Sequence, residues 1–308
     1  NPGNKPFFGD FGMADLAIRH YRQRTYRKIP VIWVLASRLY GFATCTAYPS
    51  SLTSNSGGNI NLARLRNPQK TLQSAVSCFQ AGDLGGAAVH CSTLLESLPK
   101  EPNALHILGA VRLRQNDPGT AVRLLTTAHE AQPKNAEVLI NLGAALRGCN
   151  KPVQAAEILR RAVSLAPANP SAHLNLANAC LSAGDRDAAI AAYRRVLELV
   201  PTHIDALRTL ADILHEEGNH ADSLDAYEAL DALEPDNPQT LNAIGALQAG
   251  LGRLDTAEEF VRRALALDPH DCDVAINLGN ILATGFHVDE ALKLYRQALL
   301  SSPDNPDL

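Results

Sequence analysis

The 34 residues from 136 to 169 read AEVLINLGAALRGCNKPVQAAEILRRAVSLAPAN. Apolar or small residues occupy the fourth, seventh, eighth and eleventh places of this stretch, namely Leu139, Leu142, Gly143 and Leu146. The i, i+3, i+4, i+7 spacing predicts one buried face of a helix. Asn150 tolerates a left-handed backbone, and Pro152 suits the first turn of a second helix. The stretch is therefore expected to form a helix–turn–helix hairpin.

This hairpin pattern recurs at a fixed period. Prolines stand 34 residues apart at seven places, which are Pro99, Pro133, Pro167, Pro201, Pro235, Pro269 and Pro303. The register divides the chain into seven units, 68–101, 102–135, 136–169, 170–203, 204–237, 238–271 and 272–305. Such units bury their apolar faces against one another and form a solenoid. The sequence thus predicts an all-α fold, an α-solenoid of about seven repeats.

Two positions of every unit carry a small side chain, counting each unit from 1 to 34. Position 8 is always Gly or Ala: Ala75, Gly109, Gly143, Ala177, Ala211, Gly245 and Gly279. Position 20 is Ala or Ser: Ala87, Ala121, Ala155, Ala189, Ser223, Ala257 and Ala291. Larger residues stand at position 24: Cys91, Leu125, Leu159, Tyr193, Tyr227, Val261 and Tyr295. We expect the small side chains to let the two helices of a hairpin approach closely.

Residues outside the repeats have a different composition. Residues 1–48 match no repeat and form a basic leader, expected to be poorly ordered, and 49–67 are a Ser/Gly-rich linker and lead-in. A basic stretch followed by apolar residues within 13–47 resembles a signal peptide, so export is the alternative to a cytoplasmic location. The apolar run is too short for a membrane span. Residues 306–308 open an eighth repeat, and we expect the natural protein to continue.

Charge and cysteine content limit the classes of partner. Residues 1–67 hold nine Lys or Arg against two Asp, whereas the remainder holds nineteen against thirty acidic residues. An acidic array repels phosphate backbones, so nucleic acid is not expected as a partner. The six cysteines form no C-x-x-C pair, and His215 and His220 lie five residues apart rather than on one helical face. No metal site and no cofactor are predicted.

The small residues at positions 8 and 20 and the proline at 32 resemble the tetratricopeptide repeat family over about residues 68–305. The resemblance implies a right-handed superhelix whose concave groove, lined by the first helices, binds an extended peptide or protein segment. It further implies a scaffold without catalysis of its own. Asparagine at position 6 resembles the asparagine ladder of the O-linked N-acetylglucosamine transferase family, where such residues hold the bound polypeptide backbone.

Seven residues are candidates for peptide contact on this basis. They are the ladder asparagines Asn141, Asn175 and Asn277, the position-9 asparagines Asn178 and Asn280, and Arg208 and Asp212 of the acidic fifth repeat. An amide donates and accepts at once, so it can satisfy any peptide backbone. The same asparagines could instead bond to neighbouring helices. The acidic character around Asp212 favours a basic or neutral ligand.

A second function stays open at this stage. The array could be the non-catalytic, substrate-recruiting arm of a larger glycosyltransferase whose catalytic domain lies beyond residue 308. No nucleophile–base pairing stands out within the chain, so it is not expected to be an enzyme itself. The sequence leaves the oligomeric state and the identity of the partner open.

Overall fold

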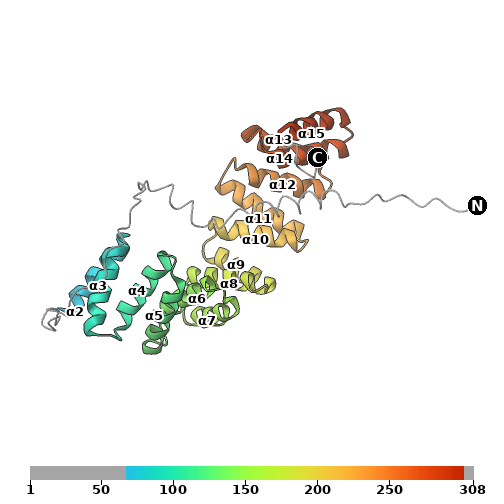
Figure 1. The fold of residues 1–308 in the computed structure, drawn as a ribbon. Helices are drawn as coiled ribbons and strands as arrows, with labels where there is room; N and C mark the ends of the chain where they lie inside the picture. Colours follow the sequence, from blue (N-terminus) through green and yellow to red (C-terminus); the bar gives the residue numbers. More distant parts are fainter. Residues whose placement is uncertain (1–66, 302–308) are drawn as a thin grey trace, which may run out of the picture. The chain divides into compact units, whose positions relative to one another are not determined.

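The computed structural model describes residues 67–301, and the leader, the linker up to residue 66 and residues 302–308 lie outside this range. The described residues form fourteen α-helices and no β-strand, which confirms the predicted all-α fold (Figure 1). The helices are α2 (Pro68–Gln80), α3 (Leu84–Ser97), α4 (Pro102–Arg114), α5 (Pro118–Ala131), α6 (Ala136–Gly148), α7 (Pro152–Leu165), α8 (Pro170–Ser182), α9 (Arg186–Leu199), α10 (Ile204–Glu216), α11 (His220–Leu233), α12 (Pro238–Gly250), α13 (Leu254–Leu267), α14 (Cys272–Thr284) and α15 (Val288–Ser301).

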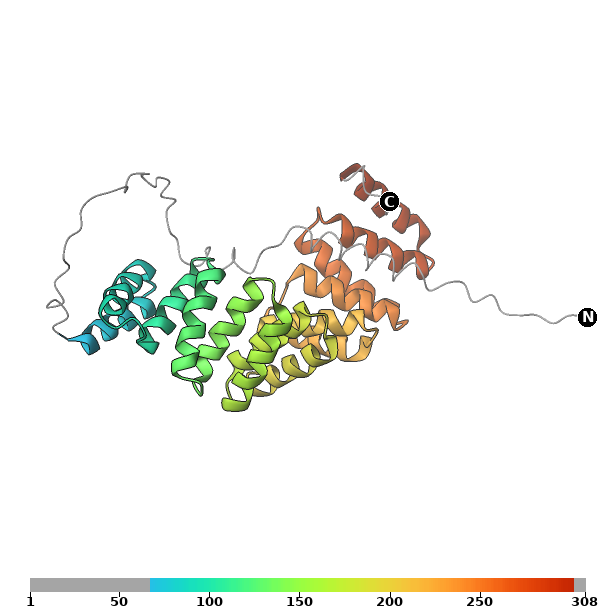
Figure 2. The same ribbon diagram turned by 60° about the horizontal axis from the view of Figure 1, so that its bottom comes forward.

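The helices belong to two compact units, residues 67–218 and residues 219–301. In the first unit the hairpins α2–α3, α4–α5, α6–α7 and α8–α9 stack in chain order, and α10 packs on α9 (Figure 2). In the second unit α11 packs on α12, and the hairpins α12–α13 and α14–α15 stack on each other. Each hairpin thus covers the apolar side of its neighbour, as a solenoid requires.

First helices of consecutive repeats also contact one another directly. These contacts join α2 to α4, α4 to α6 and α6 to α8 in one unit, and α12 to α14 in the other. Within residues 67–301, the second helices of consecutive repeats do not approach one another to this extent. We call the solvent side of α2, α4, α6 and α8, and separately that of α12 and α14, the first-helix face of its unit.

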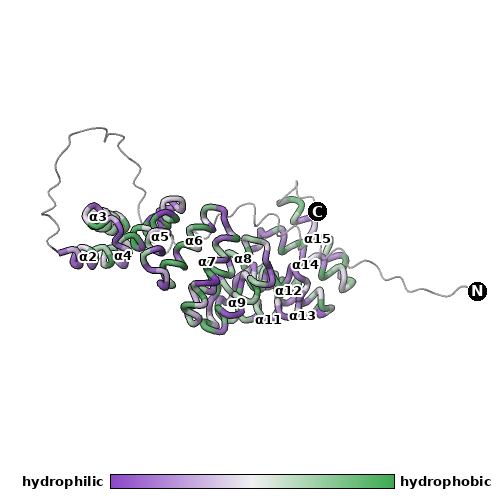
Figure 3. Tube along the Cα trace, turned by 90° about the horizontal axis from the view of Figure 1, so that it is seen from below, coloured by the Kyte–Doolittle hydropathy of each residue, from purple (hydrophilic) through white to green (hydrophobic). Residues whose placement is uncertain are grey.

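Alternating hydropathy along each helix explains the stacking. Hydrophobic and hydrophilic stretches follow one another along the helices (Figure 3). Every helix from α2 to α15 contributes buried apolar residues to the core. In the first unit a continuous core joins four consecutive repeats through small and branched apolar side chains, among them Leu125, Leu142, Leu159, Val196 and Leu210. Burial of this shared surface supplies most of the driving force, because an isolated helix of 13 or 14 residues is marginal in water.

The small residues at position 8 lie against the large residues at position 24 of the same repeat. A Cβ atom added to Gly109 would stand 2.6 Å from Leu125 Cγ, and one added to Gly279 would stand 2.5 Å from Tyr295 Cε1. Gly143 meets Leu159 in the same way, and Gly245 meets Val261. The predicted close approach of paired helices is therefore confirmed. The structure also shows that the side chain at position 24 fills the space beside each glycine at position 8.

Turn and cap residues also follow the sequence pattern. Asn169 is an N-cap whose Oδ1 accepts from the N–H groups of Ser171 (2.9 Å) and Ala172 (3.3 Å), and Asn135 and Asn237 cap α6 and α12 alike. Residues at position 15 have positive φ, as predicted for Gly and Asn. Phe286 stands at this position in the last repeat and also adopts φ 65°. Its side chain is 89% exposed, so burial does not compensate for this backbone.

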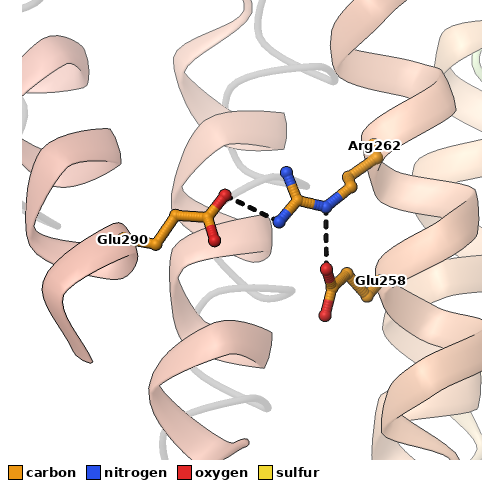
Figure 4. A network of polar contacts seen from close by, with 3 residues as sticks. All are labelled: Glu258, Arg262 and Glu290. Atoms are coloured by element: carbon orange, nitrogen blue, oxygen red, sulfur yellow. Dashed lines mark hydrogen bonds and ion pairs between the residues drawn. The ribbon is translucent and has the colours of Figure 1, made fainter. Parts of the chain in front are cut away.

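One polar network ties the last two repeats together. Arg262 of α13 donates from Nε to Glu258 Oε1 (2.8 Å) and from Nη2 to Glu290 Oε1 of α15 (2.7 Å), as Figure 4 shows. Hydrogen bonding to Arg262 holds the pKa of Glu290 below its ordinary value. The three side chains are partly exposed, so this network adds little to the stability of the fold.

Candidate functional site

The candidate residues of position 6 all lie on first helices, and two of them bond to the preceding repeat. Asn141 of α6 donates from Nδ2 to His106 Nε2 of α4 at 2.8 Å. The imidazole nitrogen that accepts this bond must be unprotonated. Burial lowers the pKa of His106, and nearby Glu137 raises it less, so the neutral ring is favoured. Asn141 therefore uses one of its two amide N–H donors within the protein, and its Oδ1 makes no hydrogen bond among the described residues.

Asn277 of α14 repeats this arrangement in the other unit. Its Nδ2 donates to Asn242 Oδ1 of α12 at 3.0 Å. Asn242 is only 3% exposed. His106 and Asn242 both stand at position 5, one residue before position 6 in the preceding repeat. A polar residue at position 5 is thus the sequence signal that predicts this bond, and the sequence analysis missed it.

Asn175 of α8 lacks such a partner. Position 5 of the preceding repeat is Ile140, a buried apolar residue that cannot accept a hydrogen bond. The Asn175 Nδ2 donates instead to the carbonyl of Ser171 in its own helix at 2.9 Å. All three ladder asparagines therefore use one of their two amide N–H donors inside the protein, and none of them uses Oδ1 among the described residues.

The position-9 asparagines have the opposite arrangement. Asn178 Oδ1 accepts from the Tyr193 hydroxyl of α9 at 2.5 Å. Asn280 Oδ1 accepts from the Tyr295 hydroxyl of α15 at 2.7 Å. Both tyrosines belong to the same repeat as the asparagine they hold, so the amide is positioned by the second helix of its own hairpin. Their Nδ2 groups make no hydrogen bond within residues 67–301.

Comparison with known proteins identifies the repeats. The sequence model of the tetratricopeptide repeat family matches residues 108–170, 150–204, 174–238 and 208–271. The chain belongs to the tetratricopeptide repeat (TPR) family. No curated protein sequence matches the chain.

Solved TPR structures share the fold. A crystal structure of MamA is 26% identical, covers 55% of this chain and 92% of its own, and has a TM-score of 0.50. The structure of pilF from Pseudomonas aeruginosa is 22% identical, covers 67% and 94%, and has a TM-score of 0.57. YrrB, described as a TPR protein with an unusual peptide-binding site, is 20% identical, covers 59% and 94%, and has a TM-score of 0.55.

The two remaining candidates lie together on one TPR helix. Arg208 and Asp212 are one helical turn apart on α10, at positions 5 and 9 of their repeat, and both are half-buried. Arg186 of α9 forms ion pairs with Glu216 and with Glu217, the latter at 3.1 Å. Part of the acidic character expected at this helix is therefore neutralised inside the unit.

Charge is distributed differently over the two first-helix faces. In the first unit Arg114 ends α4, where its guanidinium carbon lies 4.3 Å from the ring centroid of Phe79, and Arg147 lies exposed near the end of α6. In the second unit α12 has no charged residue, and α14 has only Asp273. The α12–α14 face is thus an almost uncharged surface of amides and small residues, suited to contacts that do not depend on salt.

No group of three or more His, Cys, Asp or Glu side chains is placed to hold a metal ion in the described part of the chain. None of the helices between residues 67 and 301 is long and apolar enough to cross a membrane.

Proposed function

We propose that this TPR chain is a protein-interaction scaffold that binds an extended peptide or protein segment along its first-helix faces, without catalysis of its own. The observation that carries the proposal is a set of half-buried amides on adjacent first helices with unused hydrogen-bonding atoms. Asn141 on α6 and Asn175 on α8 each keep Oδ1, and Asn178 on α8 keeps Nδ2. Groups of both polarities can satisfy a peptide backbone whatever its side chains are.

The surroundings of these amides support contact with a polypeptide. Ala110 and Ala144 occupy position 9 on α4 and α6. Because these side chains are small, the backbone of a bound peptide can approach the two helices closely. Ile107 and Leu174 are partly exposed next to them and offer apolar contact for alternate side chains. The peptide-binding site ascribed to YrrB adds a precedent on the same fold.

The test is a peptide-binding measurement on the whole chain. A 12-residue peptide is selected from a random phage-displayed library on the immobilised chain, synthesised with a fluorophore and titrated. Alanine at Asn141, Asn175 and Asn277 together is expected to weaken its binding about tenfold or more, since several hydrogen bonds of about 1 kcal/mol are lost. The far-ultraviolet circular dichroism should stay nearly unchanged.

The matched control is Gln154→Ala. Gln154 is an exposed amide on the second helix α7 and should not affect the peptide. If the triple variant and the wild type bind the peptide with equal affinity, the three asparagine amides are not part of the binding surface. A library that yields no enriched peptide would contradict the scaffold function.

A further inference from the structure

Helix α15 is a second helix whose side toward a following repeat is open. In three other repeats the residue at position 28 packs in one cluster with the residue at position 3 of the following first helix, in the pairs Leu95 with Ala104, Val163 with Ala172, and Leu265 with Val274. Among the described helices, none follows α15, and α15 packs on α14. The side that joins one repeat to the next is therefore uncovered here.

Three apolar side chains form a stripe along this open side. Val288, Leu292 and Leu299 stand at positions 17, 21 and 28, and their spacing of four and seven residues places them on one side of the helix. They are 44–52% exposed. In the other six second helices, every apolar residue at these positions is buried or half-buried. An apolar stripe that is covered in six repeats and open in the seventh indicates an interaction surface.

Two charged residues follow one edge of the stripe. Arg296 stands at position 25, where the arginines of two other repeats reach an acidic side chain of the following repeat: Arg160 lies 3.5 Å from Asp185, and Arg262 lies 2.7 Å from Glu290. Asp289 stands seven residues before Arg296, on the same side of α15. Neither Asp289 nor Arg296 forms an ion pair within residues 67–301. This edge thus offers one acidic and one basic group two turns apart.

The first repeat does not offer a surface that would fit this stripe. In repeats two to seven, the residues at positions 3 and 10 of the first helix are buried and small or apolar: Ala104, Val138, Ala172, Ala206, Thr240, Val274, Val111, Ala145, Ala179, Ile213, Leu247 and Ile281. The same positions of α2 are the exposed residues Lys70 and Ser77. Head-to-tail stacking of one copy on another would place an ammonium group against leucine, which is unfavourable.

We propose that the α15 stripe binds the same stripe of a second copy of this chain, with the two α15 helices antiparallel about a two-fold axis. The surface is complementary to itself in this arrangement. Val288 of one copy meets Leu299 of the other, a pairing centred between residues 293 and 294. Asp289 meets Arg296, a pairing centred between residues 292 and 293. The two centres differ by about 1.5 Å along the helix, so a single axis serves both pairings.

The same axis also places the remaining groups. Leu292 lies within about one turn of the axis, so the two copies of this residue come close together at the centre. An axis perpendicular to the pair of helices keeps both charged edges on one side, where each Asp289 lies next to an Arg296 of the other copy. Such a contact uses the same patch on both copies and closes after two. The inference is independent of peptide binding, because it concerns a second helix rather than the first-helix faces.

The oligomeric state of the whole chain tests the proposal. One pair of helices buries less than about 1,000 Å² in total, so association should be weak, with a dissociation constant in the micromolar range. Sedimentation equilibrium between about 1 and 200 µM should show monomer and dimer in exchange. A monomer at every concentration would overturn the proposal, and so would a series of species that grows beyond the dimer.

Substitutions in the stripe locate the contact. Leu292→Glu with Leu299→Glu places four carboxylates in the dimer contact, and the dissociation constant should rise at least tenfold. The matched control is Val89→Glu with Val153→Glu, which changes two exposed valines of α3 and α7 and should leave dimerisation unchanged. Far-ultraviolet circular dichroism verifies that both variants keep their helices. A stripe variant that dimerises as the wild type does would overturn α15 as the contact.

Charge reversal tests the antiparallel pairing and does not depend on the apolar variant. Asp289→Arg alone and Arg296→Asp alone each put like charges at both symmetric contacts, so each variant should dimerise about fivefold more weakly than the wild type. An equimolar mixture of the two variants joins an acidic with a basic group at both contacts. The mixture should therefore dimerise with nearly the wild-type affinity. If mixing restores nothing, or if the single variants dimerise as the wild type does, the two-fold pairing is overturned.

Discussion

Substitution of Gly109 by alanine tests the packing that makes the array possible. Gly109 lies in the middle of α4, and an added Cβ would stand 2.6, 2.8 and 3.3 Å from three carbons of Leu125. Ordinary contact begins at about 3.5 Å. Leu125 is fully buried in the core shared by consecutive repeats, so its side chain cannot move without displacing its neighbours.

The expected magnitude follows from two opposed terms. Overpacking a filled core by one methyl group costs about 1–3 kcal/mol. Alanine is the better helix former, which returns up to about 1 kcal/mol in the interior of α4. The net free energy of unfolding should therefore fall by about 1 kcal/mol. The measurement is urea unfolding followed by circular dichroism at 222 nm, with the midpoint and the slope compared.

Gly119→Ala is the matched control in the same repeat. Gly119 lies in the first turn of α5, and the nearest atom to its added Cβ is Asp117 Oδ1 at 4.0 Å. This variant gains helix propensity without collision and should be neutral or more stable than the wild type. Leu125→Ala should also abolish the penalty of Gly109→Ala, because it opens space for the methyl group. The reasoning would be refuted if Gly109→Ala changed the free energy of unfolding equally in the wild type and in Leu125→Ala. It would also be refuted if Gly109→Ala and Gly119→Ala had the same effect.

Three further outcomes follow from the same structure. Ala189→Leu places a large side chain at a fully buried position and should destabilise the array by about 1–3 kcal/mol, and an unchanged melting temperature would count against the repeat register. Phe286→Gly should stabilise the protein by about 0.5–1 kcal/mol, because a φ of 65° is strained for Phe and the ring is exposed. Thermal unfolding measures this change, and a loss of stability would show that the ring contributes packing. The pKa of His129 is lowered by burial and by Arg161, so the neutral ring stabilises the fold. That contribution to stability is complete above the unfolded pKa of about 6.5 and is lost as the pH falls through the folded pKa. In His129→Gln, the free energy of unfolding measured with urea should therefore depend less on pH between about 7 and 5 than in the wild type.

Part of the candidate site could be predicted from the sequence. Periodicity located Asn141, Asn175 and Asn277 on first helices, because position in a repeat decides which side of a helix a residue occupies. The atoms that remain for a ligand could not be predicted in this way. They depend on what stands across the helix contact: His106 and Asn242 accept a hydrogen bond, and Ile140 cannot.

Phe286 shows a similar division. Its place in the repeat indicates the turn between two helices, yet a bulky aromatic residue disfavours a positive φ. The structure has φ 65° at this residue all the same. The two flanking helices must pack in the shared orientation, and this requirement outweighs the local preference of one residue.

The amino-acid sequence alone determined the helices, their turns and the repeat. These depend on local spacing of apolar, small and turn-forming residues, and the 34-residue period repeats that spacing seven times. Only the tertiary structure decided that Gly279 faces Tyr295, that the Tyr295 hydroxyl holds Asn280, and which amide atoms remain for a partner. Such contacts join residues 15 or 35 positions apart through directional hydrogen bonds. Hydropathy patterns indicate which residues are buried, but they do not indicate which donor and acceptor atoms pair in a hydrogen bond.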